Sequence, residues 1–463
     1  MAQTQKKQGD MGTGSVKKLL LQLMIPAVVA QIVNLLYNIV DRIYIGHIPG
    51  IGAAALTGVG LFTPILMLLN AFAMLIGAGG APRTAIAMGQ GDKEQAEKIV
   101  SNSFTMLLIF SVLLTVVFYA AAPALLRMFG ASDATLPYAL AYSRIYILGS
   151  VCVLIVLGMN PFVTTQGFAA FSMLTTVIGA VCNIILDPIF IFVLNMGVAG
   201  AAVATVIGQF CGCALAIWLN HTKNPDITLS LKGFRPDLRL IGEIYAIGFP
   251  SVIMVAIGSV MTFLMNKILI TYHSAHETAA TAFGAYFKLN SFIFMPVFGL
   301  NNGVVPIVAY NYGAQNRRRM VETIKRSTLY AASFMVLGTL LFCAIPGTLL
   351  KIFDATDTML SVGIPALRII SLSFGMAGAC IALGSSFQAL GKSVYSMVTS
   401  IVRQLVFLIP IAYVLARYGA SVGNSDLVWW CYPIAEIASL ALTLGFFSHL
   451  HKTVISPLPE GHE

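Results

Sequence analysis

Apolar runs long enough to cross a lipid bilayer recur along the whole chain. Each has about 20 predominantly apolar residues or more, the length that an α-helix needs to span the hydrocarbon. Of the 463 residues, 58% are hydrophobic and only 10% are charged, and the mean hydropathy is +0.86. We therefore predict an all-α polytopic membrane protein with twelve transmembrane helices. The predicted spans are 19–44, 56–79, 99–122, 136–159, 171–194, 199–220, 240–270, 279–309, 321–345, 359–383, 394–416 and 427–449.

The basic residues are distributed unevenly over the segments that connect these spans. If the N-terminus is cytoplasmic, 18 of the 27 Lys and Arg residues fall on the cytoplasmic side, 5 on the outer side and 4 within predicted helices. Such an excess of positive charge marks the cytoplasmic side of membrane proteins. We expect both termini in the cytoplasm. The net charge of +9 then requires no nucleic-acid partner.

A repeat with a constant offset divides the chain into two halves. MFGASDATL at 128–136 matches IFDATDTML at 352–360, and the same shift of 224 residues superposes GQGD at 89–92 on GAQN at 313–316. Each half holds six spans, so both halves enter the membrane from the same side and form parallel repeats around a central cleft, an architecture typical of alternating access. The predicted organisation is a cytoplasmic N-terminal segment 1–18, an N-lobe 19–220, a cytoplasmic linker 221–237, a C-lobe 238–449 and a cytoplasmic tail 450–463.

Polar side chains interrupt the apolar runs mainly in the first half. Spacings of three, four and three residues place four of them on one face of the first helix. An Asn and an Asp lie one turn apart on the fifth helix, and a Thr on the sixth helix lies at a similar predicted depth. These residues are Gln31, Asn34, Asn38, Asp41, Asn183, Asp187 and Thr205.

The two carboxylates, Asp41 and Asp187, are the most informative of these residues. A charged carboxylate at membrane depth costs about 2.5 to 3.5 kcal/mol even on the mild insertion scale, which favours a functional role. Two neighbouring carboxylates raise each other's affinity for a proton, and they could equally bind Na⁺. We therefore predict a cation-coupling site here, with Pro188 and Pro26 as candidate hinges, because proline removes a main-chain hydrogen bond and favours a kink.

Structural roles for these carboxylates are the alternative. Asp187 could pair locally with Arg144, and Asp41 with Arg42 could mark the lipid headgroup boundary. The second half lacks the acid pair and instead contains three charged residues whose role stays open between a buried ion pair and a substrate or gating function. They are Lys288, Arg403 and Glu436.

The order of several motifs carries a family resemblance over the whole chain. VDRIYIGHIPGIGAAALTGVG, the GQGD turn, NIILDPIF and YFKLNSFIFMPVFGLNNG together resemble the multidrug and toxic compound extrusion (MATE) family, and within it the bacterial MepA-like and DinF-like branch. This resemblance implies a cation site formed by Asp41, Asn183, Asp187 and Thr205, with Tyr142 and Asn160 in the same network. Asn160, however, is predicted near the cytoplasmic end of its helix.

The resemblance implies export of amphipathic, often cationic organic compounds across a bacterial inner (cell) membrane, driven by entry of H⁺ or Na⁺. We expect the protein to work as a monomer in the bilayer, because one chain contains both halves. No other cofactor or metal is expected, because the seven cysteines lie in apolar runs without metal-ligand spacing. A flippase or exporter of a lipid-linked or other amphiphilic metabolite remains the alternative function. An enzyme is not expected, because the chain contains neither HExxH nor GxSxG.

Overall fold

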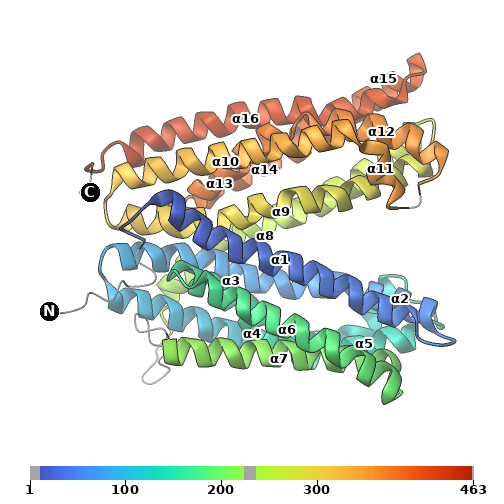
Figure 1. The fold of residues 1–463 in the computed structure, drawn as a ribbon, viewed down its shortest axis with the longest axis horizontal. Coiled ribbons are helices and arrows are strands. Elements are labelled where there is room, and N and C mark those ends of the chain that lie inside the picture. Colours follow the sequence, from blue (N-terminus) through green and yellow to red (C-terminus); the bar gives the residue numbers. More distant parts are fainter. Residues whose placement is uncertain (1–10, 224–235, 354, 461–463) are drawn as a thin grey trace. The chain divides into compact units, whose positions relative to one another are not determined.

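The computed structural model describes residues 11–223, 236–353 and 355–460, and these residues form helices and no strands (Figure 1). The helices of the first half of the chain are α1 (Val16–Gly46), α2 (Gly52–Leu61), α3 (Thr63–Gly89), α4 (Lys93–Met128), α5 (Leu136–Thr165), α6 (Ala169–Pro188), η1 (Ile189–Val193) and α7 (Gly197–Lys223). Those of the second half are α8 (Leu238–Tyr272), α9 (Glu277–Gly313), α10 (Arg317–Ala344), α11 (Pro346–Lys351), α12 (Asp357–Ser371), α13 (Phe374–Ala389), α14 (Ser393–Ile401), η2 (Val402–Leu408), α15 (Ile409–Val422), η3 (Ser425–Trp430), α16 (Cys431–Leu450) and η4 (His451–Ile455).

The described residues contain eleven helical segments that are long and apolar enough to span a membrane, and the bent pair α12–α13 makes a twelfth. The predicted all-α fold with twelve spans is confirmed. The two helices of the pair meet at 49°. At the bend, the Ser373 hydroxyl donates to the carbonyl oxygen of Ile370 at 2.6 Å, and the Leu372 amide donates to that of Ile369, so the chain turns more tightly than an α-helix.

The chain folds as two compact units. One is built from Ile25–Gly248, and the other from Gly12–Met24 and the residues from Phe249 onward. The border therefore lies within α1 and within α8, whereas the sequence places the linker at 221–237, of which 224–235 lie outside the described residues. Both helices cross the border next to a proline, Pro26 in α1 and Pro250 in α8, and these prolines are related by the 224-residue repeat.

The two units repeat the same internal hydrogen bonds in the predicted register. In each unit, a threonine hydroxyl of the third span donates to a carbonyl oxygen of the fourth span, and a serine hydroxyl of the fifth span donates to another. Every donor and acceptor of the first unit lies 224 residues before its counterpart. The pairs are Thr115 with Ile147 and Thr339 with Ser371, then Ser172 with Asn160 and Ser396 with Gly384.

Helix α3 and the first part of α8 cross at direct main-chain contact in the first unit. A Cβ atom added at Gly79 would collide with the carbonyl oxygen of Ile244, and one added at Gly248 would collide with that of Leu75. Only glycine permits this approach. The crossing explains why residues 238–248 pack with the first unit rather than with the rest of α8.

Candidate functional site

Helix α6 ends at the candidate site, where the chain changes from an α-helix to a π-helical turn. Asp187 and Pro188 are the last two residues of α6, and the chain continues directly into the π-helical turn η1. Proline has no amide hydrogen to donate to the preceding turn, and π-helical turns occur frequently at functional sites. Pro188 therefore lies at an irregularity of the helix, the position expected of a hinge residue.

Asn183 links the fifth and sixth spans at the level of Asp187. Its side-chain Nδ2 donates to Asp187 Oδ1 at 3.2 Å and to Thr205 Oγ1 at 3.1 Å. The Thr205 hydroxyl in turn donates to the carbonyl oxygen of Ala201 at 2.9 Å. Asp187 is fully buried, and Asn183 and Thr205 are 2% and 4% exposed. The structure thus brings the predicted residues of α6 and α7 into one hydrogen-bonded cluster.

Asp41 completes the cluster from α1 and is 7% exposed. Its carboxyl group is close enough to that of Asp187 for the two to interact electrostatically. Tyr142, which the resemblance placed in this network, lies beside Asp41 and Thr205. Tyr37 also lies beside the acid pair, although the sequence reasoning did not include it. Its position four residues before Asp41 is a signal that could have found it, because residues i and i+4 share a helix face.

Three oxygen atoms of this cluster are buried without a hydrogen-bond donor among the described residues. They belong to the two carboxylates and the amide: Asp41 Oδ1, Asn183 Oδ1 and Asp187 Oδ2. Buried acceptors are normally paired, and an ionised carboxylate can only accept. Oxygen atoms without donors suit a bound proton or a hard cation such as Na⁺, whose preferred ligands are oxygens. The residues present therefore fit a cation-binding site.

The contacts bear differently on the two structural alternatives for the acid pair: Asp41 lies within electrostatic range of Arg42, whereas the pairing of Asp187 with Arg144 is not formed. Arg144 does not pair with Asp187; its guanidinium lies over the ring of Tyr119, 5.6 Å from the centroid. On α1, Gln31 is half-buried and both Asn34 and Asn38 are exposed. Asn38 donates to the carbonyl oxygen of Asn34 at 2.6 Å, so the amide group of Asn38 finds a hydrogen-bond partner within α1 itself.

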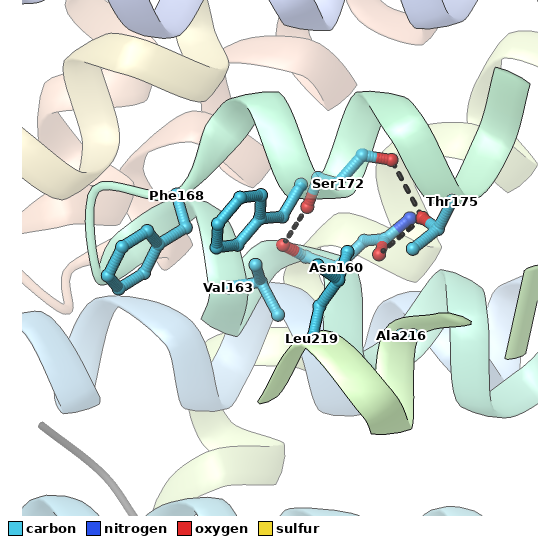
Figure 2. Close-up of a pocket in the computed structure, with 8 residues that line it drawn as sticks. Asn160, Val163, Phe168, Ser172, Thr175, Ala216 and Leu219 are labelled. Carbon is cyan, nitrogen blue, oxygen red and sulfur yellow. Dashed lines mark hydrogen bonds between the residues drawn. The ribbon is translucent and has the colours of Figure 1, made fainter. Parts of the chain in front are cut away.

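Asn160 lies apart from the acid pair, in a small pocket between α5, α6 and α7 (Figure 2). Its side-chain oxygen accepts from the Thr175 hydroxyl at 3.3 Å, and its main-chain oxygen accepts from Ser172 at 2.9 Å. Thr175 precedes Asp187 by three turns of α6, a rise of about 18 Å. The resemblance placed Asn160 in the cation network. In the structure, Asn160 lies near the C-terminal end of α5 and bonds to α6 about three turns before Asp187. The pocket, of about 290 Å³ including its open side, is otherwise lined by Val163, Phe168, Phe171, Ala216 and Leu219.

The charged residues predicted in the second half separate into two environments. Arg403 Nη1 lies 3.3 Å from Glu436 Oε2, so these two form an ion pair within the second unit. Lys288 is exposed, and its ammonium group lies 5.6 Å from the centroid of the Phe353 ring. Of the two basic residues predicted in this half, Glu436 thus pairs with Arg403 and not with Lys288.

Comparisons with known proteins place the chain in a family. The family model described as MatE matches residues 26–189 and again residues 250–414, two matches offset by the repeat that the sequence shows. Together they cover more than half of the chain, and the protein belongs to the MATE family of membrane transporters. The predicted resemblance is confirmed, and the family places the protein in a cell membrane.

Several relatives share nearly the full length of the chain. The multidrug export protein MepA of Staphylococcus haemolyticus is 26% identical over 93% of both chains, and that of Staphylococcus aureus strain MRSA252 is 23% identical over the same shares. An outward-facing structure of a multidrug resistance MATE family transporter is 25% identical with a TM-score of 0.86, covering 96% of this chain and 99% of its own. The chain also shares its fold with a MOP superfamily transporter from Pyrococcus furiosus. That protein is 24% identical, with a TM-score of 0.87, and the match covers 97% of this chain and 98% of its own.

Proposed function

We propose that the protein is a secondary active multidrug exporter that exchanges amphipathic, often cationic organic compounds for H⁺ or Na⁺. The observation that carries the proposal is the buried pair Asp41 and Asp187 in a member of a transporter family. Together with Asn183, this pair has three oxygen atoms without a donor among the described residues. A protein that must bind and release a small cation needs such an incompletely satisfied site. The curated relatives that export drugs support the substrate class.

The proposed cycle couples the cation to alternating access of the two lobes. Entry of the cation at the acid pair replaces the missing donors and changes the net charge of the buried site. Pro188 and Pro26 allow their helices to bend in response, since each lacks one main-chain hydrogen bond. The repeat supports this mechanism, because two similar halves in one chain can rock against each other within a monomer. In the proposed orientation, both termini lie in the cytoplasm and the substrate leaves across the inner membrane.

Efflux from proteoliposomes tests this function. Purified protein is reconstituted with a fluorescent organic cation inside the vesicles, and release is followed under an imposed proton gradient and then under a sodium gradient. We expect release under at least one gradient, with the effective gradient identifying the coupling ion. Protein-free liposomes and vesicles with collapsed gradients are the controls. Release that is the same with and without either gradient would overturn coupled export.

The Thr205 hydroxyl is expected to contribute less to ion coupling than the two carboxylates do, and its contribution can be measured separately. Replacing Thr205 with valine keeps the shape of the side chain but removes the acceptor for Asn183, leaving a buried amide donor unpaired at a cost of about 1 to 3 kcal/mol. We expect the initial rate of gradient-driven efflux to fall about tenfold. Thr205→Ser, which keeps the hydroxyl, should retain at least half of the wild-type rate. Equal rates for the two variants would show that the hydroxyl has no part in coupling.

A further inference from the structure

A turn at residues 273–276 joins α8 to α9 within the second unit. His273 directly follows the last residue of α8 and is 4% exposed, whereas the other three residues of the turn are half-buried or exposed. Imidazole is the side chain that most readily changes charge between pH 5 and 8, and a ring nitrogen that gains a proton changes from acceptor to donor. The contacts of this buried ring therefore decide what a proton would do to the turn.

A hydrogen bond within the turn fixes the protonation of the His273 ring. The Ala275 amide donates to His273 Nδ1 at 3.1 Å, so Nδ1 is an unprotonated acceptor and the single proton of the ring lies on Nε2. The ring nitrogen closes the turn in the way that a side-chain oxygen closes an Asx turn. A second proton would occupy Nδ1 and face the amide hydrogen, so the bond that closes the turn cannot persist in the charged form.

Backbone strain in the same turn favours opening when that bond is lost. His276 has φ 42° and ψ −113°, and a positive φ is uncommon in residues other than glycine. Such a conformation persists only where surrounding contacts hold it. Besides the bond to Ala275, the His276 ring donates from Nδ1 to the carbonyl oxygen of Ile270 at 2.9 Å, and the Ser274 amide donates to the Ser425 hydroxyl at 3.0 Å.

Asp426 is placed to pair with the His273 ring once the ring is charged. Its Oδ1 lies 3.9 Å from Nε2, beyond hydrogen-bond range, and 42% of its side chain is exposed, which leaves it room to move closer. Nε2 is buried without a hydrogen-bond partner among the described residues, and so is Nε1 of Trp429. The ring of Trp429 lies 6.0 Å from that of His273, and Trp429 shares a face of the 3₁₀-helix η3 with Asp426, three residues earlier. A carboxylate that moved inward would meet an unsatisfied donor.

The other charged groups around the ring lie farther from it. In the part of the chain that the structure describes, Asp426 is the one carboxylate within 4.0 Å of a His273 nitrogen. The turn itself adds His276, and α9 begins with Glu277, both of them exposed. From α15, Arg417 lies beside Tyr272, the residue before His273. The charge of the His273 ring is thus opposed most directly by Asp426.

The first unit makes the corresponding turn without these histidines. The 224-residue shift places His273 over Pro49 and His276 over Gly52. A Cβ atom at Gly52 would collide with the carbonyl oxygen of Gly46, which is the counterpart of the Ile270 oxygen that His276 contacts. Proline and glycine are therefore sufficient to connect the two spans, and the connection itself does not explain a buried histidine.

We propose that His273 is a pH-sensitive latch on the turn 273–276. In the neutral form, the ring accepts from Ala275 and holds the turn closed. A proton taken up from solvent at Nδ1 breaks that bond, releases the turn and draws Asp426 to Nε2. The closed turn is therefore present at high pH and lost as the pH falls. The latch lies at the C-terminal end of α8, the outer side in the proposed orientation, and it is a regulatory site separate from the acid pair of the first unit.

Hydrogen–deuterium exchange of the full-length protein in lipid nanodiscs tests the latch, because exchange reports on the turn itself and requires no transport. A peptide that covers the turn is followed at about pH 7.5 and about pH 5.5, and each rate is divided by the intrinsic exchange rate at that pH. We expect protection of the Ala275 amide to fall about tenfold at the lower pH, as one hydrogen bond is lost. In His273→Asn, the side-chain oxygen accepts from Ala275 at both pH values, so protection should change less than about twofold. Unchanged protection in the wild type, or the same fall in His273→Asn, would overturn the inference.

Two further variants separate His273 from its neighbours. His276→Asn removes the other imidazole of the turn and should keep the fall in protection, because asparagine tolerates a positive φ. Asp426→Asn removes the charge that draws the ring, and we expect the fall to shrink to about threefold or less. The inference fails if the fall disappears in His276→Asn or is undiminished in Asp426→Asn. Because no measurement here depends on export, such a failure would leave the proposed function standing.

Discussion

Replacing Asp187 with asparagine is expected to abolish gradient-driven export and to lower the initial rate at least about 100-fold, the scale on which removal of a proton-transferring group acts. The side chain keeps its size and can still accept from Asn183. An amide, however, neither takes up a proton at ordinary pH nor presents a negative charge to Na⁺. The measurement is efflux from proteoliposomes under the gradient that drives the wild type.

A matched substitution separates this effect from a general loss of function. Asp133 is 92% exposed at the side chain, and its one ion pair among the described residues is with the exposed Arg127, so Asp133→Asn should transport at the wild-type rate. The Asp187→Asn protein should remain monodisperse in detergent, because neutralising a buried carboxylate that has an unpartnered oxygen removes a desolvation cost. Gradient-driven transport at the wild-type rate in Asp187→Asn would place the coupling site elsewhere.

Replacing Gly248 with alanine is expected to give the largest loss of stability. The added methyl group would overlap the carbonyl oxygen of Leu75, so α3 and α8 must separate along the whole crossing. Overpacking of this kind costs about 1 to 3 kcal/mol, which corresponds to a fall in Tm of about 5 °C. Thermal unfolding can be followed with a thiol-reactive dye, because all seven cysteines are free and none is exposed in the folded structure.

Gly242→Ala on the same helix is the control for this stability prediction. A Cβ atom at Gly242 meets no heavy atom within 4 Å, so the exchange should stabilise the helix by up to about 1 kcal/mol through its better helix propensity. The two alanine variants should therefore shift Tm in opposite directions. A Tm for Gly248→Ala at or above that of the wild type would mean that the close crossing of α3 and α8 is not maintained in the membrane.

Hydrophobic length and the repeat were sufficient to predict the architecture. A run of about 20 apolar residues has one stable conformation in a bilayer, because each main-chain polar group must be satisfied within the helix. The offset of 224 residues then related the two halves, and hydrogen bonds such as those of Thr115 and Thr339 recur at that offset. The bend after Ser371 was not predicted, because a short turn between two apolar helices does not change the hydropathy.

Helical spacing also brought out the main residues of the site but not their neighbours. Asp41 and Asp187 stood out because a carboxylate in an apolar run is costly. Their proximity, the bridging role of Asn183 and the presence of Tyr37 depend on how α1 packs beside α6, and spacing within one helix carries no information about that packing. Asn160 shows the same limit, because a role taken from the resemblance named a residue that the structure places about three helical turns away.

The sequence by itself determined the membrane location, the twelve helices, the parallel repeat and the identity of the unusual charges, because each follows from composition or periodicity along one chain. Only the tertiary structure decided which charges meet: Asp41 lies beside Asp187, Arg403 beside Glu436, and Arg144 over an aromatic ring instead of a carboxylate. The physical reason is that helix rotation and crossing are set by side-chain packing and close glycine contacts between distant segments. Those contacts leave no periodic trace in the sequence.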